Sequence, residues 1–203
     1  MPEQAVARPD SRETVSLYLV GLVLLVVLPM LNVLPAEDSW LHLSDFRLNQ
    51  FGKFLAFAIL ALGLDLIWGY CGVLSMGQGV FFGLGAYCMG MYLALQIGTE
   101  SVYGSELPDF MVWTQVKELP LFWYPFKSFA GGVLGAILVP VLFATLFGFL
   151  AFRSRIKGVY FAIITQALAF AAWLVFNRNE TRLGGTNGLT DFKQALGFRL
   201  SDP

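Results

Sequence analysis

Long uncharged runs separated by polar segments dominate the pattern of the chain. Four windows of at least 20 residues contain no Asp, Glu, Lys or Arg, namely 14–36, 66–99, 128–152 and 158–177. A helix needs about 20 apolar residues to cross the hydrocarbon core of a bilayer. The pattern therefore predicts a protein that crosses a membrane several times.

Five helical spans are expected within a transmembrane domain over residues 14–177, between a polar tail and a glycine-rich tail. The tails cover residues 1–13 and 178–203, and the spans cover about residues 14–36, 54–74, 79–97, 128–152 and 158–177. Pro29 is expected to kink the first helix, and Thr190 to cap a short helix in the second tail. The predicted fold class is all-α, a polytopic bundle of about five transmembrane helices.

A glycine-rich break is expected between the second and third spans, because the window 66–99 is longer than one helix requires. The stretch GYCGVLSMGQG, residues 69–79, supplies it. The break is either a tight turn at the membrane surface or a re-entrant loop. Irregular backbone is tolerated at membrane depth only where protein or water surrounds it.

The composition excludes several classes of function. Hydrophobic residues make up 57% of the 203 residues and charged residues only 13%, against roughly 25% charged in soluble proteins. Thirteen Lys and Arg against 14 Asp and Glu leave no basic surface for nucleic acid. One histidine cannot build a histidine-based metal cluster.

The stretch GGTNG lacks the Lys-Ser/Thr of a phosphate-binding loop. The chain is therefore expected to be neither an enzyme nor a cofactor carrier, with any ATP hydrolysed by a separate subunit.

The dense basic turn of Arg153, Arg155 and Lys157 lies between two uncharged spans. Short positive turns favour the cytoplasmic side of a membrane. Counting crossings from there places the N-terminus inside and the loop 100–127 outside. The aromatic cluster around Phe122, Trp123 and Tyr124 in that loop fits an interfacial aromatic belt.

Uncharged and charged polar side chains within or near the spans are the candidates for a solute pathway. Asp65 is the carboxylate embedded in a span, and either lines the pathway or ties neighbouring helices together. Amide and hydroxyl groups would suit a small neutral solute, although they equally serve as hydrogen bonds between helices. The candidate residues are Asp65, Gln78, Thr165, Gln166 and Asn187.

Small residues at GxxxG-like spacing form the second group of candidates. Glycine lets helices approach closely in lipid. These positions either pack the bundle or border a permeation path, and both roles can coexist. The candidate packing residues are Gly79, Gly83, Gly85, Gly90, Gly131 and Gly135.

Two stretches resemble the signature regions of permease subunits from branched-chain amino acid and urea ABC importers. They are LALGLDLIWGYCGVLSMGQGVFFGLGAYCMGMYLAL at 60–95 and GVYFAIITQALAFAAWLVFNRNETRLGGTNGLTDF at 158–192. The loop SELPDFMVWTQVKELPLFWYPF at 105–126 resembles the urea branch more closely. Asp65 fits that branch too, since the amino-acid branch more often carries Asn there. Relatives often carry His where Gln78 stands.

The resemblance implies a bacterial inner-membrane permease that works by alternating access. Its implied partners are a second permease, cytoplasmic ATP-binding subunits and a periplasmic solute-binding protein. Urea is the first expected solute and a branched-chain amino acid the second. A structural membrane subunit and a passive channel are the alternatives from other classes. Relatives continue well past this length, so the chain is expected to be incomplete at its C-terminus.

Overall fold

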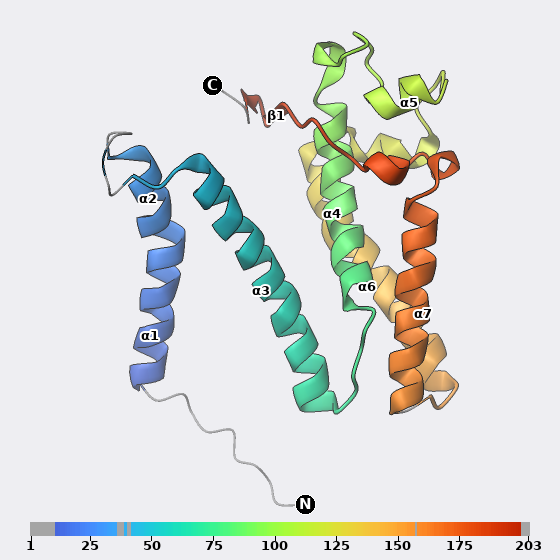
Figure 1. The fold of residues 1–203 in the computed structure, drawn as a ribbon. Coiled ribbons are helices and arrows are strands. Elements are labelled where there is room, and N and C mark those ends of the chain that lie inside the picture. The colour runs from blue at the N-terminus through green and yellow to red at the C-terminus, as the bar shows by residue number, and fades with distance from the viewer. Residues whose placement is uncertain (1–10, 36–38, 40–41, 157, 200–203) are drawn as a thin grey trace, which may run out of the picture. The chain divides into compact units, whose positions relative to one another are not determined.

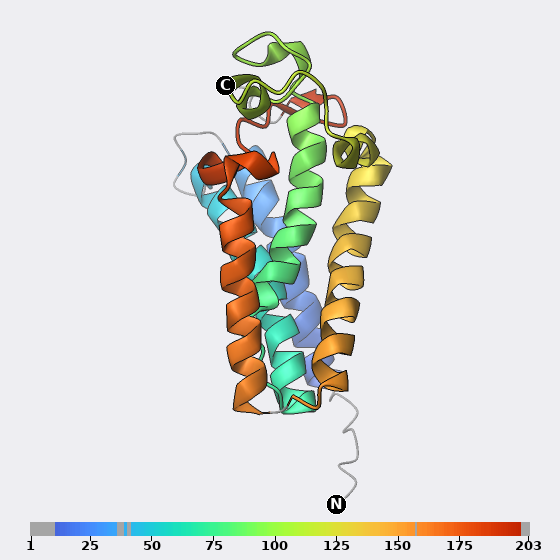
Figure 2. The same ribbon diagram turned by 90° about the vertical axis from the view of Figure 1, so that its right-hand side faces the viewer.

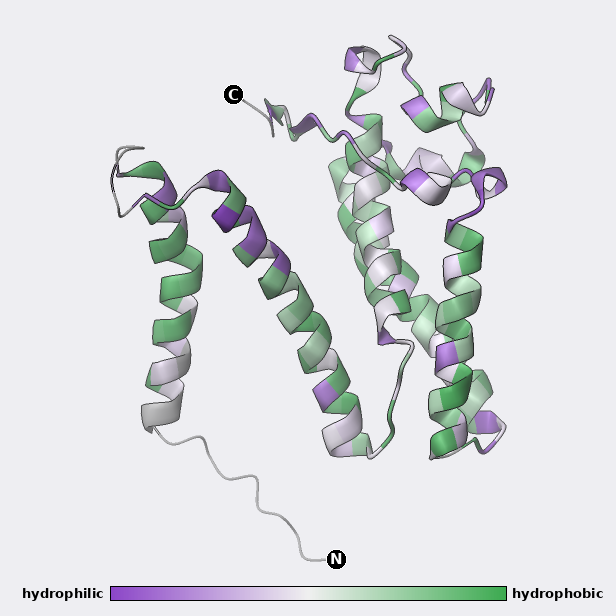
Figure 3. Cartoon of the chain, viewed as in Figure 1, coloured by the Kyte–Doolittle hydropathy of each residue, from purple (hydrophilic) through white to green (hydrophobic). Residues whose placement is uncertain are grey.

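The computed structural model describes residues 11–35, 39, 42–156 and 158–199, and this part of the chain is mostly helical. It contains helices long and apolar enough to cross a membrane at Thr14–Val33, Asp45–Cys71, Gln78–Leu95, Phe129–Arg153 and Val159–Phe176. Hydrophobic residues cover these helices, whereas hydrophilic residues gather in the connections and the first turns of the second span (Figure 3). The predicted all-helical fold with five spans is confirmed.

The chain divides into two compact units, Met1–Ile59 and Leu60–Pro203, with the boundary inside a helix. The first unit begins with α1 (Ser11–Leu22), the π-helical segment η1 (Val23–Val27) and α2 (Leu28–Val33). Leu28 donates its backbone N–H to the carbonyl of Val23, five residues back. Such widened turns accommodate disruptions of the regular helical ladder. The π-helical turn ends two residues before Pro29, and the helix continues through this proline as α2.

The second span begins earlier than its apolar pattern indicates. Helix α3 runs over Asp45–Cys71, whereas hydrophobicity alone predicted a start near residue 54. Asp45 lies in the first turn, where a negative charge favours a helix N-terminus. Asn32 donates through Nδ2 to the carbonyl of Leu43 at 2.8 Å and to Oδ1 of Asp45 at 2.6 Å. These hydrogen bonds hold the N-terminus of α3, so the helix begins with polar turns ahead of its apolar part.

The second unit contains the remainder of α3 together with α4 (Gln78–Leu95), α6 (Phe129–Arg153) and α7 (Val159–Phe176). Helix α4 lies between α6 and α7 (Figures 1 and 2). The α4–α6 contact is tight because a Cβ added at Gly132 would lie 2.9 Å from Cβ of Tyr92. A Cβ at Gly135 of α6 would lie 3.4 Å from Cβ of Cys88 on α4, and 2.5 Å from Cε1 of Phe126 outside this helix pair. The small residues thus allow close helix packing.

One end of this unit carries a folded cap of short elements. They are η2 (Gly98–Glu100), α5 (Asp109–Trp113) and η3 (Leu121–Lys127), with α5 and η3 beside the ends of α4 and α6 (Figure 1). Trp123 is fully buried with Met111 and Cys88 in a hydrophobic cluster. Trp123 thus packs against the bundle through η3, whereas Phe122 and Tyr124 of the same cluster are exposed, so the aromatic belt stays a prediction.

The tail after α7 returns over the end of α4. It forms η4 (Asn179–Thr181), η5 (Gly185–Asn187) and an antiparallel hairpin of β1 (Gln194–Ala195) and β2 (Phe198–Arg199). Leu196 and Gly197 both have positive φ, at 52° and 81°, as a two-residue hairpin turn requires. The short helix expected after Thr190 is therefore wrong. Leu196 N donates to the Tyr92 hydroxyl at 3.3 Å, which fastens the hairpin to α4.

Candidate functional site

The break between α3 and α4 folds back into the second unit, to which it belongs. Helix α3 ends at Cys71, the chain turns at Gly72 with a φ of +63°, and α4 begins at Gln78. A Cβ added at Gly63 would lie 3.1 Å from Nε2 of Gln78, so the start of α4 lies beside Gly63. Gly63 precedes the end of α3 by eight residues, or about 12 Å of helix. Residues 72–77 therefore run back along α3 (Figure 1), which favours the re-entrant form.

Thr165 of α7 holds this re-entrant segment. Its side chain is fully buried, and its Oγ1 accepts a hydrogen bond from the backbone N–H of Met76 at 3.0 Å. The same hydroxyl lies 3.0 Å from the carbonyl of Phe161 and 2.9 Å from that of Ala162, to which it donates. A backbone N–H at membrane depth needs a protein acceptor. Thr165 supplies that acceptor.

Gly77 lies directly against α7. A Cβ at this position would lie 2.8 Å from the carbonyl oxygen of Thr165 and 3.2 Å from its Cβ. Any larger residue would therefore displace the segment from α7. Ser75, two residues earlier, is also buried, with 4% of its surface exposed. Sequence reasoning missed Ser75 because nothing in its local pattern distinguishes it from a surface serine.

Gln78 presents an unused acceptor at the start of α4. Its Oε1 is shielded from solvent and has no hydrogen-bond partner among the described residues. Gln78 and Ser75 are polar members of an otherwise largely apolar lining around a hollow of about 420 Å³, to which Ile67 and Phe147 contribute. An uncompensated amide oxygen in such surroundings is costly. The hollow is therefore suited to a molecule that brings an N–H or O–H donor.

A groove of about 440 Å³ lies between α4 and α7. Gly79 and Gly83 line it from α4, Ala169 and Trp173 from α7, and Asn187 from the tail. A Cβ at either of the two glycines would meet no atom within 4 Å. Within the second unit these glycines widen a groove instead of packing two helices together.

The other candidate packing glycines have close neighbours in the second unit. A Cβ at Gly85 would lie 2.9 Å from the carbonyl of Ala136, and one at Gly90 would lie 3.1 Å from Cδ1 of Leu189. Gly131 lies against the carbonyl of Pro125, and Gly135 against Phe126. The sequence spacing alone did not separate these positions from the groove-lining pair.

The five pathway candidates do not form one cluster. Gln78 and Thr165 flank the break from opposite sides, whereas Asp65 on α3 and Gln166 on α7 are exposed and lack hydrogen-bond partners among the described residues. Asn187 is exposed in η5. The structure thus brings together two candidates around the break and leaves the other three on separate surfaces.

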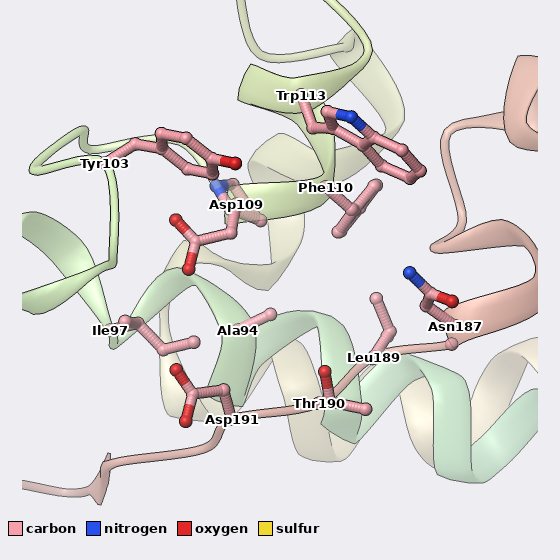
Figure 4. Close-up of a pocket in the computed structure, with 12 residues that line it drawn as sticks. Ala94, Ile97, Tyr103, Asp109, Phe110, Trp113, Asn187, Leu189, Thr190 and Asp191 are labelled. Atoms are coloured by element: carbon pink, nitrogen blue, oxygen red, sulfur yellow. The ribbon is translucent and has the colours of Figure 1, made fainter.

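A second cavity lies at the capped end of the unit, between α5 and the tail (Figure 4). Its volume is about 310 Å³, and its polar lining includes Asp109, Asp191 and Asn187. Asp109 accepts from the backbone N–H of Val102 through Oδ2 at 3.2 Å, while its Oδ1 has no partner among the described residues. Sequence reasoning assigned both aspartates to polar connections, where their meeting could not be foreseen.

The basic turn and the cap lie at opposite ends of the second unit (Figure 1). Arg153 ends α6, and Arg155 follows it with a positive φ of 57°. Lys157, the third base of this turn, lies outside the described residues. The assignment of the basic turn to the cytoplasm stays a prediction.

Comparison with known families gives one match. A sequence model described as branched-chain amino acid transport system / permease component matches residues 46–201. No curated protein and no solved structure matches the chain. The matched range includes the re-entrant break, the groove and the cavity at the capped end.

Proposed function

Because the chain belongs to the permease family of branched-chain amino acid transport systems, we propose that it forms part of the solute pathway of an ATP-driven importer. It is a multi-pass, non-catalytic membrane component of such a system. The family generally works with ATP-hydrolysing subunits and a solute-binding protein. We extend this to a second permease subunit and to the bacterial inner membrane.

The observation that carries this proposal is the re-entrant break and its anchoring to α7. Transporters place solute sites where helices are discontinuous, because the freed polar groups can then face the solute. Here Thr165 fixes Met76, while the Oε1 of Gln78 has no protein partner among the described residues. A purely structural subunit has no need for such an unmet acceptor beside a hollow.

We also propose that the permease works by alternating access, and the same geometry supports this. The break joins α3 to α4 through Gly72 and contacts α7 at Gly77, so a small shift of α7 would be transmitted to the start of α4. Closure of the ATP-hydrolysing partners would supply the shift. A solute moves only if its contacts differ between the outward-open and inward-open states. The hydrogen bond between Met76 and Thr165 is a candidate for such a difference.

Urea is the solute that we propose first. The hollow beside Gln78 offers uncharged polar groups, Gln78 and Ser75, within an apolar lining. Urea has N–H donors for an amide oxygen and carries no charge that would need a counter-ion. The resemblance of the loop 105–126 to urea permeases supports the same choice.

A branched-chain amino acid is the second candidate, and one observation favours it. The cavity at the capped end combines two carboxylates, Asp109 and Asp191, with the apolar side chains of Ile97 and Leu189. This combination suits the α-ammonium group of such an amino acid together with its aliphatic side chain.

Uptake measurements test both substrates. Deletion of the gene is expected to abolish high-affinity uptake of labelled urea or, failing that, of labelled leucine, at low external concentration. Re-expression from a plasmid is the control. Unchanged uptake of both solutes would refute the importer proposal and favour a structural role. Uptake that persists when the ATP-hydrolysing partner is inactivated would favour a passive channel.

A further inference from the structure

The cavity at the capped end has the dimensions of a site for a small solute. Its volume of about 310 Å³ lies at the lower end of the range for ligand sites. Three segments form it: Ala94 with Ile97, the region from Tyr103 to Trp113, and the tail from Asn187 to Asp191 (Figure 4). No one of these segments makes the cavity alone.

Asp109 places an unsatisfied acceptor at this cavity. Its Oδ2 accepts the backbone N–H of Val102 in a long, solvent-exposed hydrogen bond of 3.2 Å, which leaves the carboxylate able to rotate. Its Oδ1 is shielded from solvent and lacks a donor among the described residues. A carboxylate oxygen removed from water without a donor is unfavourable. The last torsion of an aspartate side chain is soft, so a small rotation can offer this oxygen to a molecule in the cavity.

The rest of the polar lining is acidic or neutral. Asp191 contributes a second carboxylate, and no Lys or Arg lines the cavity. The nearest cation described beside Asp191 is Lys193, whose Nζ is 4.0 Å from Oδ2 in a surface ion pair. Figure 4 shows the amide nitrogen of Asn187 directed toward the hollow and the hydroxyl of Thr190 at its edge. The lining therefore offers acceptors for N–H groups and, separately, donors for an oxygen.

Apolar side chains complete the lining. Ala94 contributes from α4, Ile97 from the turn before η2, Phe110 and Trp113 from α5, and Leu189 from the tail. In the described part of the chain no group of three or more His, Cys, Asp or Glu side chains could hold a metal ion. The balance of carboxylate and hydrocarbon suits a small organic molecule with N–H donors.

We propose that this cavity is an external docking site for the transported solute, in which Asp109 accepts the N–H groups of the solute and Asn187 faces its oxygen. The proposal rests on the proposed function. The shared chemistry is a nitrogen group with several N–H donors. The two possible sources are the ammonium of an aliphatic amino acid, which would also use the apolar wall, and the amides of urea, which would not.

Binding to the purified importer complex in lipid nanodiscs, without the solute-binding protein, tests the site directly. Leucine and urea are titrated separately while tryptophan fluorescence is recorded. The signal from Trp113 is isolated as the difference from a Trp113→Phe variant. Saturable quenching by leucine identifies the ammonium source, and saturable quenching by urea identifies the amide source. The absence of saturable quenching with both solutes would overturn the proposal.

The variant Asp109→Asn tests the assigned contact. An amide oxygen can still accept from Val102, so the cap should fold, but the charged acceptor is lost. The half-saturation concentration of the bound solute is expected to rise about tenfold or more, as for loss of a hydrogen bond to a charged group. Glu106→Gln is the matched control, because this exposed residue of the same segment lies outside the cavity lining. Its half-saturation concentration should stay within about twofold of the parent protein.

The two hypotheses fail in different ways. An equal half-saturation concentration in Asp109→Asn and Glu106→Gln would refute the docking site, even if the cells import the solute normally. Saturable binding that depends on Asp109 in a protein whose deletion leaves uptake unchanged would refute the importer function and keep the site. Yield of the assembled complex, measured for each variant, shows that the comparison concerns folded protein.

Discussion

Replacing Thr165 with valine removes the acceptor that holds the re-entrant break. The two side chains have nearly the same shape, so the fully buried position should still be filled. The backbone N–H of Met76 would lose its partner at 3.0 Å. Leaving a buried donor unsatisfied costs about 1–3 kcal/mol. Because this hydrogen bond is only partly buried, we expect the free energy of unfolding to fall by about 1–2 kcal/mol.

Two measurements on the protein in detergent or nanodiscs report this loss. The Tm should fall by about 2–8 °C, by analogy with soluble domains of similar size. Hydrogen–deuterium exchange should accelerate in residues 72–77, because their local opening becomes easier. Thr165→Ser keeps the hydroxyl and should retain the exchange protection of this segment, even though it loses a buried methyl group.

A matched control separates the hydrogen bond to the break from the loss of a helical hydroxyl. Thr145 on α6 donates to the carbonyl of Val141 at 2.8 Å. Thr145→Val should change the free energy of unfolding by no more than about 0.5 kcal/mol. Equal Tm values and equal exchange in Thr165→Val and Thr145→Val would refute the assigned role of Thr165.

The same contact can be disturbed from its other side. Gly77→Ala would place a Cβ 2.8 Å from the carbonyl oxygen of Thr165, and overpacking of this kind costs about 1–3 kcal/mol. Gly79→Ala is the control, since a Cβ there meets no atom within 4 Å. If both alanine variants have the same Tm and uptake rate, the break does not depend on close contact with α7.

Three further predictions concern packing, topology and charge. Gly135→Leu should reduce the yield of folded protein, because Phe126 occupies the space. Gly83→Leu should fold but impair assembly with a second permease. A normal yield of the assembled complex with Gly83→Leu would show that this face contacts lipid. A cysteine at Ser154 should resist membrane-impermeant thiol reagents in intact cells, and ready labelling from outside would reverse the topology. Asp65→Asn should assemble and transport within about twofold of the parent protein, as for an exposed position, while loss of uptake at normal assembly would make the carboxylate part of the pathway.

The sequence alone was sufficient to predict the helical spans, because the lipid bilayer imposes a requirement that each segment must meet locally. Every backbone polar group in the hydrocarbon must be satisfied within the chain, so an uncharged run of sufficient length becomes a helix. The windows 128–152 and 158–177 became α6 and α7 with ends that differ by one residue. The rule weakens outside the hydrocarbon, and there the early start of α3 at Asp45 and the hairpin after Thr190 were missed.

The tertiary structure decided which polar and small residues meet. Thr165 and Met76 are 89 positions apart, and their hydrogen bond depends on the path of the break between α3 and α7. Gly83 and Gly85 look equivalent in sequence, yet one lines a groove and the other lies against the carbonyl of Ala136. The spacing of residues in the sequence determines which of them share one face of a helix. Whether another segment packs against that face depends on the tertiary structure. The local sequence therefore determined the spans, while long-range packing determined the break, the groove and the acidic cavity.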